Sequence, residues 1–426
     1  MTKLLIILVL VLALLAIAQL ARVYELTSRL RGKREEDISP ADTRMNANLM
    51  YVFLVVYFAF FAWLAWAYKD KMLPIAASAH GVELDQLLNF NWWILLVMFV
   101  ITNVALFWFA GKYAYKKDRK AYYYAHNNKL ELAWTVIPAL FLAVIIIYGL
   151  RVWNDITTPA SAEALKVELY AKQFDWTARY PGADGALGAT DFRLINDGNP
   201  LGIVTRESVA MRLGELKAEI DAMDSTMHHG ILPDVKVHEL EARIAKLERT
   251  SARIVNLRTV MEQDIAEKGE ASPYTHGADD VVIKEFHLPL RMEADILVRS
   301  RDVIHSAYLP HMRAQMNAVP GMTTRIKMTP TISTDSMRTV TKNEAFDFIL
   351  LCNKICGASH YNMQMPLVVE SPADYKAWYA EAMKKPFQPS ALPLAPAPAV
   401  SDSTVVTADT TAAVKVDTTA TASLKN

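Results

Sequence analysis

The chain has 426 residues, of which 52% are hydrophobic and 21% are charged, and its formal net charge at pH 7 is +0. This balance excludes a general attraction to nucleic acid or to acidic surfaces, and the presence of only two cysteines excludes a disulfide-rich scaffold. Most of the hydrophobic excess lies before residue 153, in runs long enough to cross a bilayer.

Four apolar stretches in this N-terminal part predict transmembrane helices. They cover about 4–21, 49–68, 92–115 and 131–152. Charged residues are confined to the connections, which argues against the alternative of helices buried in a soluble core. We therefore divide this part into residues 1–48 and 49–91, each a helix with its loop, and 92–155, a pair of helices.

The distribution of basic residues sets the orientation of these helices. The loops after the first and third spans are rich in Lys and Arg, whereas the loop after the second holds only Lys69 and Lys71, offset by acidic residues. Because basic loops stay in the cytoplasm, the short N-terminus and the large C-terminal region are expected on the outer side.

The first stretch also resembles a signal peptide, because Met-Thr-Lys precedes its apolar run. Cleavage would start the chain outside, and three remaining spans would then leave both basic loops outside and the C-terminal domain in the cytoplasm. The charge distribution therefore favours a retained first span.

Short alternating segments from about residue 164 predict strands. Their β-branched and aromatic residues, broken by Pro and Gly, are typical of a small antiparallel sandwich or barrel. The segments are 165–170, 281–287, 295–299, 323–328 and 346–351. We expect this domain to cover 164–387.

A helical insert is expected at about 200–275 within that domain. Apolar residues recur at three- and four-residue steps over 205–223 and 234–266, which predicts an antiparallel helical hairpin with Asp234 capping its second arm. The hairpin is either a solvated projection or a docking site for a partner. The remaining residues, 388–426, lack aromatics and are rich in Pro, Ala, Ser and Thr, which is typical of a disordered tail.

Metal-binding side chains gather in one short segment, which reads Cys352-Asn-Lys-Ile-Cys356-Gly-Ala-Ser-His360-Tyr-Asn-Met363. Thiolates and a thioether suit copper, and imidazole suits copper or zinc. Two cysteines four residues apart can bridge two copper ions, which requires a second imidazole from elsewhere. The best candidate is His305, in the segment Asp302-Val-Ile-His305-Ser.

Two alternatives to copper remain at this point. A structural zinc site of two Cys and two His is chemically allowed. A disulfide between Cys352 and Cys356 is the other alternative, and it leaves His360 and Met363 without a role. Of the other histidines, His287 and His311 lie nearest the segment, where they are candidates for supporting the ligands.

Several of these segments together resemble cytochrome c oxidase subunit II, over roughly 92–180 and 279–380. The resemblance rests on the C-x₃-C-x₃-H-x₂-M pattern with its upstream histidine, on Trp134-Thr-Val-Ile-Pro138, and on Gln173-Phe-Asp-Trp176. It implies four transmembrane helices followed by an all-β cupredoxin-like (Greek-key) domain. The spans at 92–155 would be the family's helical pair, which makes the first two spans additions.

The resemblance implies a ligand set for a dinuclear copper A centre. Cys352 and Cys356 would bridge two coppers, His305 and His360 would each bind one, and Met363 would be an axial ligand. The backbone carbonyl of Lys354 would be the other axial ligand. The family usually has Glu at this position, whose carboxylate also helps to hold a magnesium ion. A Lys side chain cannot do so, which puts the magnesium in doubt.

The resemblance also implies roles for three residues outside the copper set. Glu131, at the start of the last span, matches a carboxylate near the mouth of a proton pathway; a solvated carboxylate at a membrane boundary is the alternative. Phe174 stands where the family commonly has Trp, the aromatic through which cytochrome c passes its electron. Phe lacks the indole N–H, and Trp176 is expected in the domain core rather than at the surface.

The function that follows is electron transfer in a respiratory terminal oxidase of a bacterial cytoplasmic membrane. Electrons from a c-type cytochrome would pass through copper to haem in subunit I, where oxygen is reduced to water with proton translocation. Expected partners are subunits I and III, the lipid bilayer, and a donor that the hairpin holds in a permanent supercomplex. The alternatives are a quinol oxidase subunit, a copper A subunit of a nitric oxide reductase, and a zinc-stabilised assembly protein.

Overall fold

The computed structural model describes residues 2–30, 39–230 and 232–390, without the side chains of residues 2–7 and 10. Two compact units are distinguished, one formed by 1–188 with 276–387 and the other centred on 189–275. Most of the predicted disordered tail, from residue 391 onward, lies outside the described residues.

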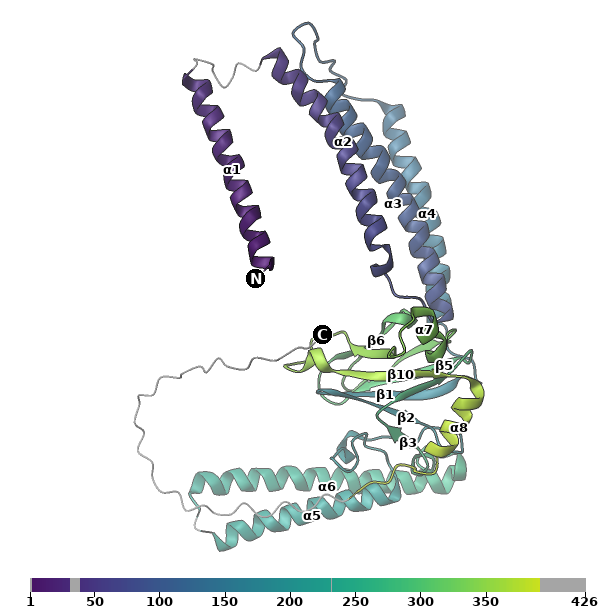
Figure 1. Cartoon of the computed structure of the whole chain (residues 1–426). Helices are drawn as coiled ribbons and strands as arrows, with labels where there is room; N and C mark the ends of the chain where they lie inside the picture. Colours follow the sequence, from purple (N-terminus) through teal and green to yellow (C-terminus); the bar gives the residue numbers. More distant parts are fainter. Residues whose placement is uncertain (1, 31–38, 231, 391–426) are drawn as a thin grey trace. The chain divides into compact units, whose positions relative to one another are not determined.

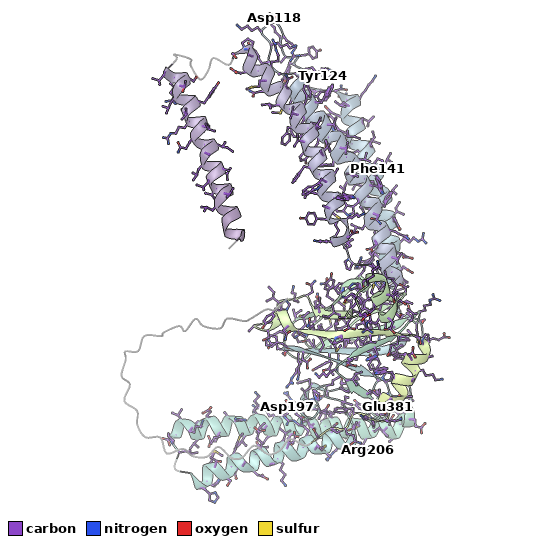
Figure 2. All side chains as sticks on the ribbon, viewed as in Figure 1. Asp118, Tyr124, Phe141, Asp197, Arg206 and Glu381 are labelled. Carbon is purple, nitrogen blue, oxygen red and sulfur yellow. The ribbon has the colours of Figure 1, made fainter. Side chains whose placement is uncertain are left out.

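Four long helices account for the apolar N-terminal part (Figure 1). They are α1 (Thr2–Leu30), α2 (Pro40–Tyr68), α3 (Ala79–Lys112) and α4 (Asn128–Thr157). Among the described residues, all four are long and apolar enough to cross a membrane, and at most 6% of their apolar windows is buried inside the chain. Phe141 of α4, labelled in Figure 2, is 47% exposed, as expected of a side chain that faces lipid.

Helix α3 extends beyond the predicted span at its N-terminal end. It begins at Ala79 rather than near residue 92, and the Ser78 side chain caps it by accepting a hydrogen bond from the Gly81 N–H. Residues 79–91 were not predicted as part of this span, because polar residues are interspersed among the apolar ones there.

Helix α2 packs on α3 within the apolar part of both helices. The contact includes aromatic pairs such as Phe53 with Phe107, whose ring centroids lie 4.9 Å apart.

Two five-stranded sheets form the outer domain, in the orders β3-β2-β1-β5-β8 and β4-β10-β9-β6-β7 (Figure 1). Their strands are β1 (Leu165–Lys172), β2 (Asp175–Tyr180), β3 (Val281–Ile283), β4 (Phe286–Pro289), β5 (Ala294–Ser300), β6 (His305–Leu309), β7 (Ala314–Ala318), β8 (Thr324–Met328), β9 (Phe348–Cys352) and β10 (Gln364–Glu370). Two short helices, α7 (Thr334–Thr341) and α8 (Pro372–Ala382), accompany them.

The expectation of a purely antiparallel domain is wrong for two strand pairs. β1 pairs with β5 in parallel, and β4 pairs with β10 in parallel. Long stretches of chain separate the members of each pair, which is what a parallel pairing requires. The predicted strand 281–287 is also divided, because Lys284 and Glu285 are not strand residues and β3 and β4 join different sheets.

A single hydrophobic core fills the space between the sheets. Its largest members, Trp176, Tyr180, Phe286 and Phe348, are at most 1% exposed. Cys352, Cys356 and Met363 belong to the same cluster. The candidate metal ligands therefore extend from a close-packed core rather than from a mobile surface loop.

A buried charge network lies beside this core. Arg179 of β2 is 1% exposed, and it donates hydrogen bonds to Glu168, to Asp280 and to the carbonyl of Gly188. Arg299 also donates to Glu168. Burial would raise the pKa of Glu168, but Arg299 and Arg179 hold it below its usual value. Burial raises the pKa of Asp280 to about 6 despite Arg179.

The second unit contains the predicted helical hairpin, formed by α5 (Arg206–His229) and α6 (Asp234–Lys268). Ion pairs between Arg206 and Glu262 and between Arg243 and Glu219 show that the two helices run antiparallel. The predicted apolar stripe is buried near one end, at Ile254, Leu257 and Met261. Asp234 is not the cap: Pro233 occupies that position and makes no side-chain cap bond.

Candidate metal centre

The ligand candidates come together at the ends of neighbouring strands. His305 is the first residue of β6 and Cys352 is the last of β9, and these two strands pair through Ala307 and Cys352. The connection 353–363 then leads into β10. The Cys352 N–H donates to the Met363 carbonyl at 3.0 Å, which closes this connection into a loop. We call residues 352–363 the cysteine loop.

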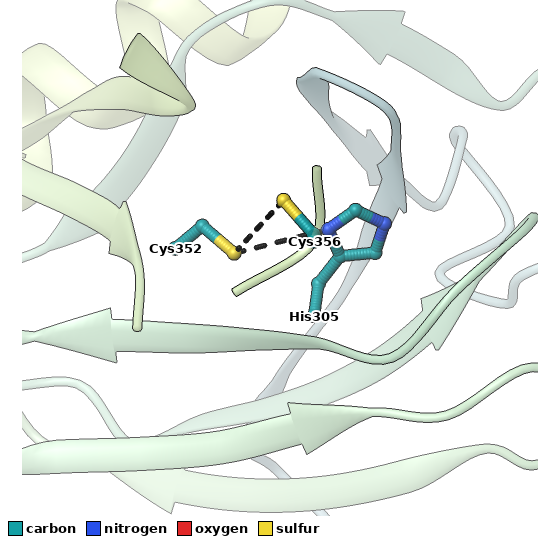
Figure 3. Close-up of side chains that lie close together, drawn as sticks. All are labelled: His305, Cys352 and Cys356. Atoms are coloured by element: carbon teal, nitrogen blue, oxygen red, sulfur yellow. Dashed lines mark hydrogen bonds between the residues drawn. The ribbon is translucent and has the colours of Figure 1, made fainter. Parts of the chain in front are cut away.

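The sulfurs of Cys352 and Cys356 and the imidazole of His305 lie close together (Figure 3). The Cys352 sulfur lies 3.8 Å from the Cys356 sulfur and 3.8 Å from Nδ1 of His305. The Cys356 sulfur lies 3.5 Å from Nδ1 of His360 and 3.7 Å from the Met363 sulfur. The Lys354 carbonyl oxygen lies 3.2 Å from the Cys352 sulfur. A continuous set of short contacts therefore joins all six predicted donors.

These separations suit shared coordination rather than a disulfide. The sulfurs are 3.8 Å apart and both cysteines are free, whereas a disulfide requires about 2.05 Å. Two sulfurs bound to one metal at about 2.3 Å with a tetrahedral angle lie about 3.8 Å apart, and a sulfur and an imidazole nitrogen lie about 3.5 Å apart. The set also holds more donors than the tetrahedral shell of a structural zinc ion, which favours two metal ions.

Asp302 fixes the orientation of His305. The imidazole is 0% exposed, and its Nε2 lies 2.8 Å from Oδ1 of Asp302. Because a carboxylate only accepts, Nε2 carries the proton and Nδ1 presents a lone pair to the sulfurs. Burial would raise the pKa of Asp302, but hydrogen bonds from the Gln173 N–H, from His305 and from the Val303 N–H hold it below its usual value.

Replacing Asp302 with alanine is expected to weaken copper binding by about 10- to 100-fold, because His305 loses the partner that selects its tautomer and holds its ring. Competition with a copper chelator, followed by copper analysis of the purified protein, measures this. Asp175→Ala is the control, because Asp175 is an exposed carboxylate at the start of β2, close to the loop, and it pairs with Lys284. Equal copper retention in the two variants would contradict the role of Asp302.

The turn between β1 and β2 packs on the cysteine loop. The Gln173 side-chain amide donates to the Cys356 carbonyl, and the Gln173 N–H donates to Asp302 at 2.7 Å. Gly357 has a φ of 140°, and a Cβ there would approach the Phe174 ring to 2.8 Å. Glycine at 357 thus permits the half-buried Phe174 to lie directly against the ligand loop.

The remaining predicted residues lie in different surroundings. Trp176 is 0% exposed and its ring meets His305 edge-on, with centroids 6.2 Å apart, so it is a core residue beside the ligand. Glu131, in the first turn of α4, accepts a hydrogen bond from the Asn127 N–H at 3.3 Å, a capping contact that needs no proton pathway. Lys354 is exposed, and its ammonium has no lone pair for magnesium.

Sequence reasoning missed the supporting roles of Asp302 and Gln173, although both belong to motifs it singled out. The only available signal for Asp302 was its position three residues before a candidate ligand. The histidines considered as supports lie elsewhere. His287 stacks on Trp378 and meets Glu285 and Glu370, whereas His311 packs between Phe346 and Phe348.

Two family models match the chain. The transmembrane domain of cytochrome c oxidase subunit II matches residues 65–152, and the periplasmic domain of cytochrome c oxidase subunit II matches residues 260–372. The second range contains His305 and the whole cysteine loop. The two ranges leave α1, most of α2 and most of the hairpin outside the family pattern.

Two proteins similar in sequence to this chain are named as subunit 2 of a cytochrome c oxidase. The alternative cytochrome c oxidase subunit 2 of Bradyrhizobium diazoefficiens is 30% identical over 72% of this chain and 81% of its own length. The cytochrome c oxidase subunit 2 of Thermostichus vulcanus is 22% identical over 72% of this chain and 77% of its own length. Among solved structures, one match is the periplasmic domain of subunit II of cytochrome oxidase from Bradyrhizobium japonicum. The match covers 54% of this chain and 99% of the solved chain, with 15% identity and a TM-score of 0.26. At this level of similarity the match does not add to the family assignment.

Proposed function

The chain belongs to the cytochrome c oxidase subunit II family, and from its cysteine loop we propose that it holds a dinuclear copper A centre that relays single electrons into the oxidase. It is an electron-transfer subunit of a terminal oxidase, anchored in the bacterial cytoplasmic membrane with its C-terminal domain on the periplasmic side. The observation that carries the copper proposal is the meeting of two free thiols, two imidazoles and a thioether at contact distance.

Each ligand has a proposed role. Cys352 and Cys356 would supply sulfur to both metal ions, His305 and His360 would supply one imidazole each, and Met363 and the Lys354 carbonyl would complete the donor set. When bound, such a centre accepts and releases one electron at a time. No magnesium role is proposed for the Lys354 side chain, because an ammonium cannot ligate a cation.

The protein surroundings favour fast transfer by holding the ligands still. Asp302 orients His305, Gln173 holds the Cys356 carbonyl, and Phe174 lies on the loop at Gly357. Both cysteines are at most 8% exposed, so water has little access to the sulfurs. A packed ligand set changes little in geometry when its charge changes, which lowers the barrier to electron transfer.

The surface of the cysteine loop supports contact with other proteins. Ile355 and Tyr361 each neighbour a ligand residue in sequence, and they are 88% and 87% exposed. We propose that these two side chains contact another protein of the complex, because aromatic and large apolar side chains are enriched in such interfaces. We propose that electrons enter near Phe174 from a c-type cytochrome, with Trp176 as a buried neighbour of His305. They leave for haem in subunit I, where oxygen is reduced.

The remaining assignments extend the same proposal. Residues 92–155 form the family's helical pair and 164–387 its copper domain, with 1–48 and 49–91 as added helices and loops. The proposal also includes proton translocation by the complex, with Glu131 contributing to a proton pathway. It further includes subunit III as a neighbour and a helical hairpin that retains the donor in a supercomplex. An intact ligand set favours a cytochrome donor over a quinol, since quinol oxidation does not require this copper.

The order in which electrons arrive tests this function. The oxidised oxidase is mixed rapidly with a reduced c-type cytochrome, and the copper absorption band and the haem bands are followed together. We expect the copper band to bleach before haem is reduced. Haem reduction that is equally fast after the copper has been removed with a chelator would contradict the relay.

A further inference from the structure

The segment before α3 is built into the outer domain as if it were part of that domain. The Ala77 N–H donates to the His311 carbonyl at 2.7 Å, and the Ala79 N–H donates to the Thr329 carbonyl at 3.0 Å. The Thr331 N–H returns a bond to the Ala77 carbonyl at 2.8 Å. Ala77 and Ser78 are 0% exposed. Backbone pairing of this kind fixes the segment rather than tethering it.

Side chains at the start of α3 tighten this junction. The Ser78 hydroxyl donates to the Met312 carbonyl at 2.6 Å while it caps α3. Gly81 leaves no space for a side chain, because a Cβ would lie 2.7 Å from the Ser78 oxygen and 3.1 Å from Cγ of Arg313. The first turn of α3 therefore lies directly against Met312 and Arg313.

Arg313 joins three separate segments at this junction. Its Nε and Nη2 each lie 2.9 Å from a carboxylate oxygen of Asp85 on α3. Its Nη1 donates to the Pro310 carbonyl at 2.7 Å, and Nη2 also donates to the Pro74 carbonyl at 2.5 Å. Pro74 lies in the loop that leads from the added helix α2. The Arg313 side chain is 12% exposed, so water screens these contacts only partly.

Arg313 also has a left-handed backbone conformation at the end of its turn. Its φ is 53°, in the left-handed region that favours glycine. The same conformation occurs at Arg291, so the role of Arg313 rests on the contacts of its guanidinium with Asp85, Pro310 and Pro74.

A single strand connects Arg313 with the metal centre. β6 begins at the ligand His305 and ends at Leu309, and the short turn Pro310–Met312 leads directly to Arg313. We propose that Arg313 is a positioning residue: it fixes the copper-bearing strand to α3 and to the loop from α2, so that the copper site keeps one position relative to the membrane helices. The copper part of this inference rests on the proposed function, whereas the junction itself does not.

Arg313→Gln in the complete oxidase tests this proposal with two readouts. Hydrogen exchange should accelerate at least about tenfold across residues 75–85. Without the Arg313 contacts, the hydrogen bonds of the Ala77 and Ala79 amides open more often. Rapid mixing should show an unchanged rate from donor to copper and an unchanged copper spectrum, but slower transfer from copper to haem. A general loss of folding would alter the copper spectrum as well.

Two further variants complete the test. Arg291→Gln is the matched control, because Arg291 also has a left-handed backbone, with φ 62°, and makes no side-chain hydrogen bond among the described residues. It should leave exchange and transfer as in the unaltered protein. Asp85→Asn, which keeps Arg313 and its carbonyl contacts, should give a smaller effect of the same kind and serves if Arg313→Gln does not fold.

The outcomes separate the junction from the copper function. If Arg313→Gln accelerates exchange at 75–85 but the protein binds no copper, the role of Arg313 at the junction is supported and the proposed function is rejected. If both Arg313→Gln and Asp85→Asn leave hydrogen exchange and copper-to-haem transfer unchanged, Arg313 does not fix the junction, whatever the copper content. Unchanged exchange with slower transfer would also reject this role of Arg313, since the junction would then not be what Arg313 holds.

Discussion

Cys356→Ser is expected to abolish the dinuclear copper signal and electron transfer from the donor, while the membrane helices stay inserted. The Cys356 sulfur contacts three other members of the donor set, lying 3.8 Å from the Cys352 sulfur, 3.5 Å from Nδ1 of His360 and 3.7 Å from the Met363 sulfur. A serine hydroxyl does not ionise at neutral pH and is a poor ligand for copper, so no second bridge can form. The loss should exceed the about 10- to 100-fold effect of removing a supporting residue.

Copper content, the paramagnetic resonance spectrum and turnover with a c-type cytochrome measure this effect together. Ala358→Ser is the control, because Ala358 is an exposed residue of the same loop and its side chain carries no ligand atom. The control should retain copper and turnover. Unchanged turnover of Cys356→Ser would show that electrons do not pass through this loop.

Arg179→Met is expected to cause the largest loss of stability in the outer domain. Arg179 is the shared partner of Glu168 and Asp280, and all three are at most 3% exposed. Removing one partner of a buried ion pair costs about 3–5 kcal/mol in the free energy of unfolding, because a charge stays buried without compensation. Arg299 still faces Glu168, so Asp280 would be the group left without its cation.

Thermal unfolding of the purified protein measures this cost. A loss of that size should lower the midpoint by roughly 6–20 °C for a domain of this size. Arg206→Met is the control, because its ion pair with Glu262 is exposed, and the control should leave the midpoint unchanged. Equal midpoints for the two variants would show that the network contributes no more than a surface pair.

Helices with strong sequence patterns were predictable from the sequence, and so was the clustering of the candidate ligands, whose role as copper ligands stays a prediction. The apolar runs of α1 to α4 and the stepwise repeats of α5 and α6 identify these helices because their patterns are local. The sulfur and imidazole donors were named because such ligands are rare and clustered, whereas the Lys354 carbonyl came only from the family resemblance. Helix ends were less predictable, since α3 begins at Ala79, where contact with the outer domain stabilises its first turns.

Features that depend on distant pairing were not predictable. Strands β2, β6, β7 and β10 were not identified, because they are short and their register is set by neighbours far along the chain. The same reason hid the network around Arg179, whose partner Asp280 lies 101 residues away, and the support of Cys356 by Gln173, 183 residues away. A charged residue in a strand, such as Arg179, is normally expected to face water, and its burial becomes evident only when its distant partners are known.

The measurement that tests the central claim most directly is the paramagnetic resonance spectrum of the purified, copper-loaded protein, together with its copper content. We expect two copper ions per chain that share a single unpaired electron, seen as hyperfine splitting from two equivalent copper nuclei. One copper with a spectrum from a single nucleus, or tight zinc binding with no such signal, would contradict the dinuclear centre.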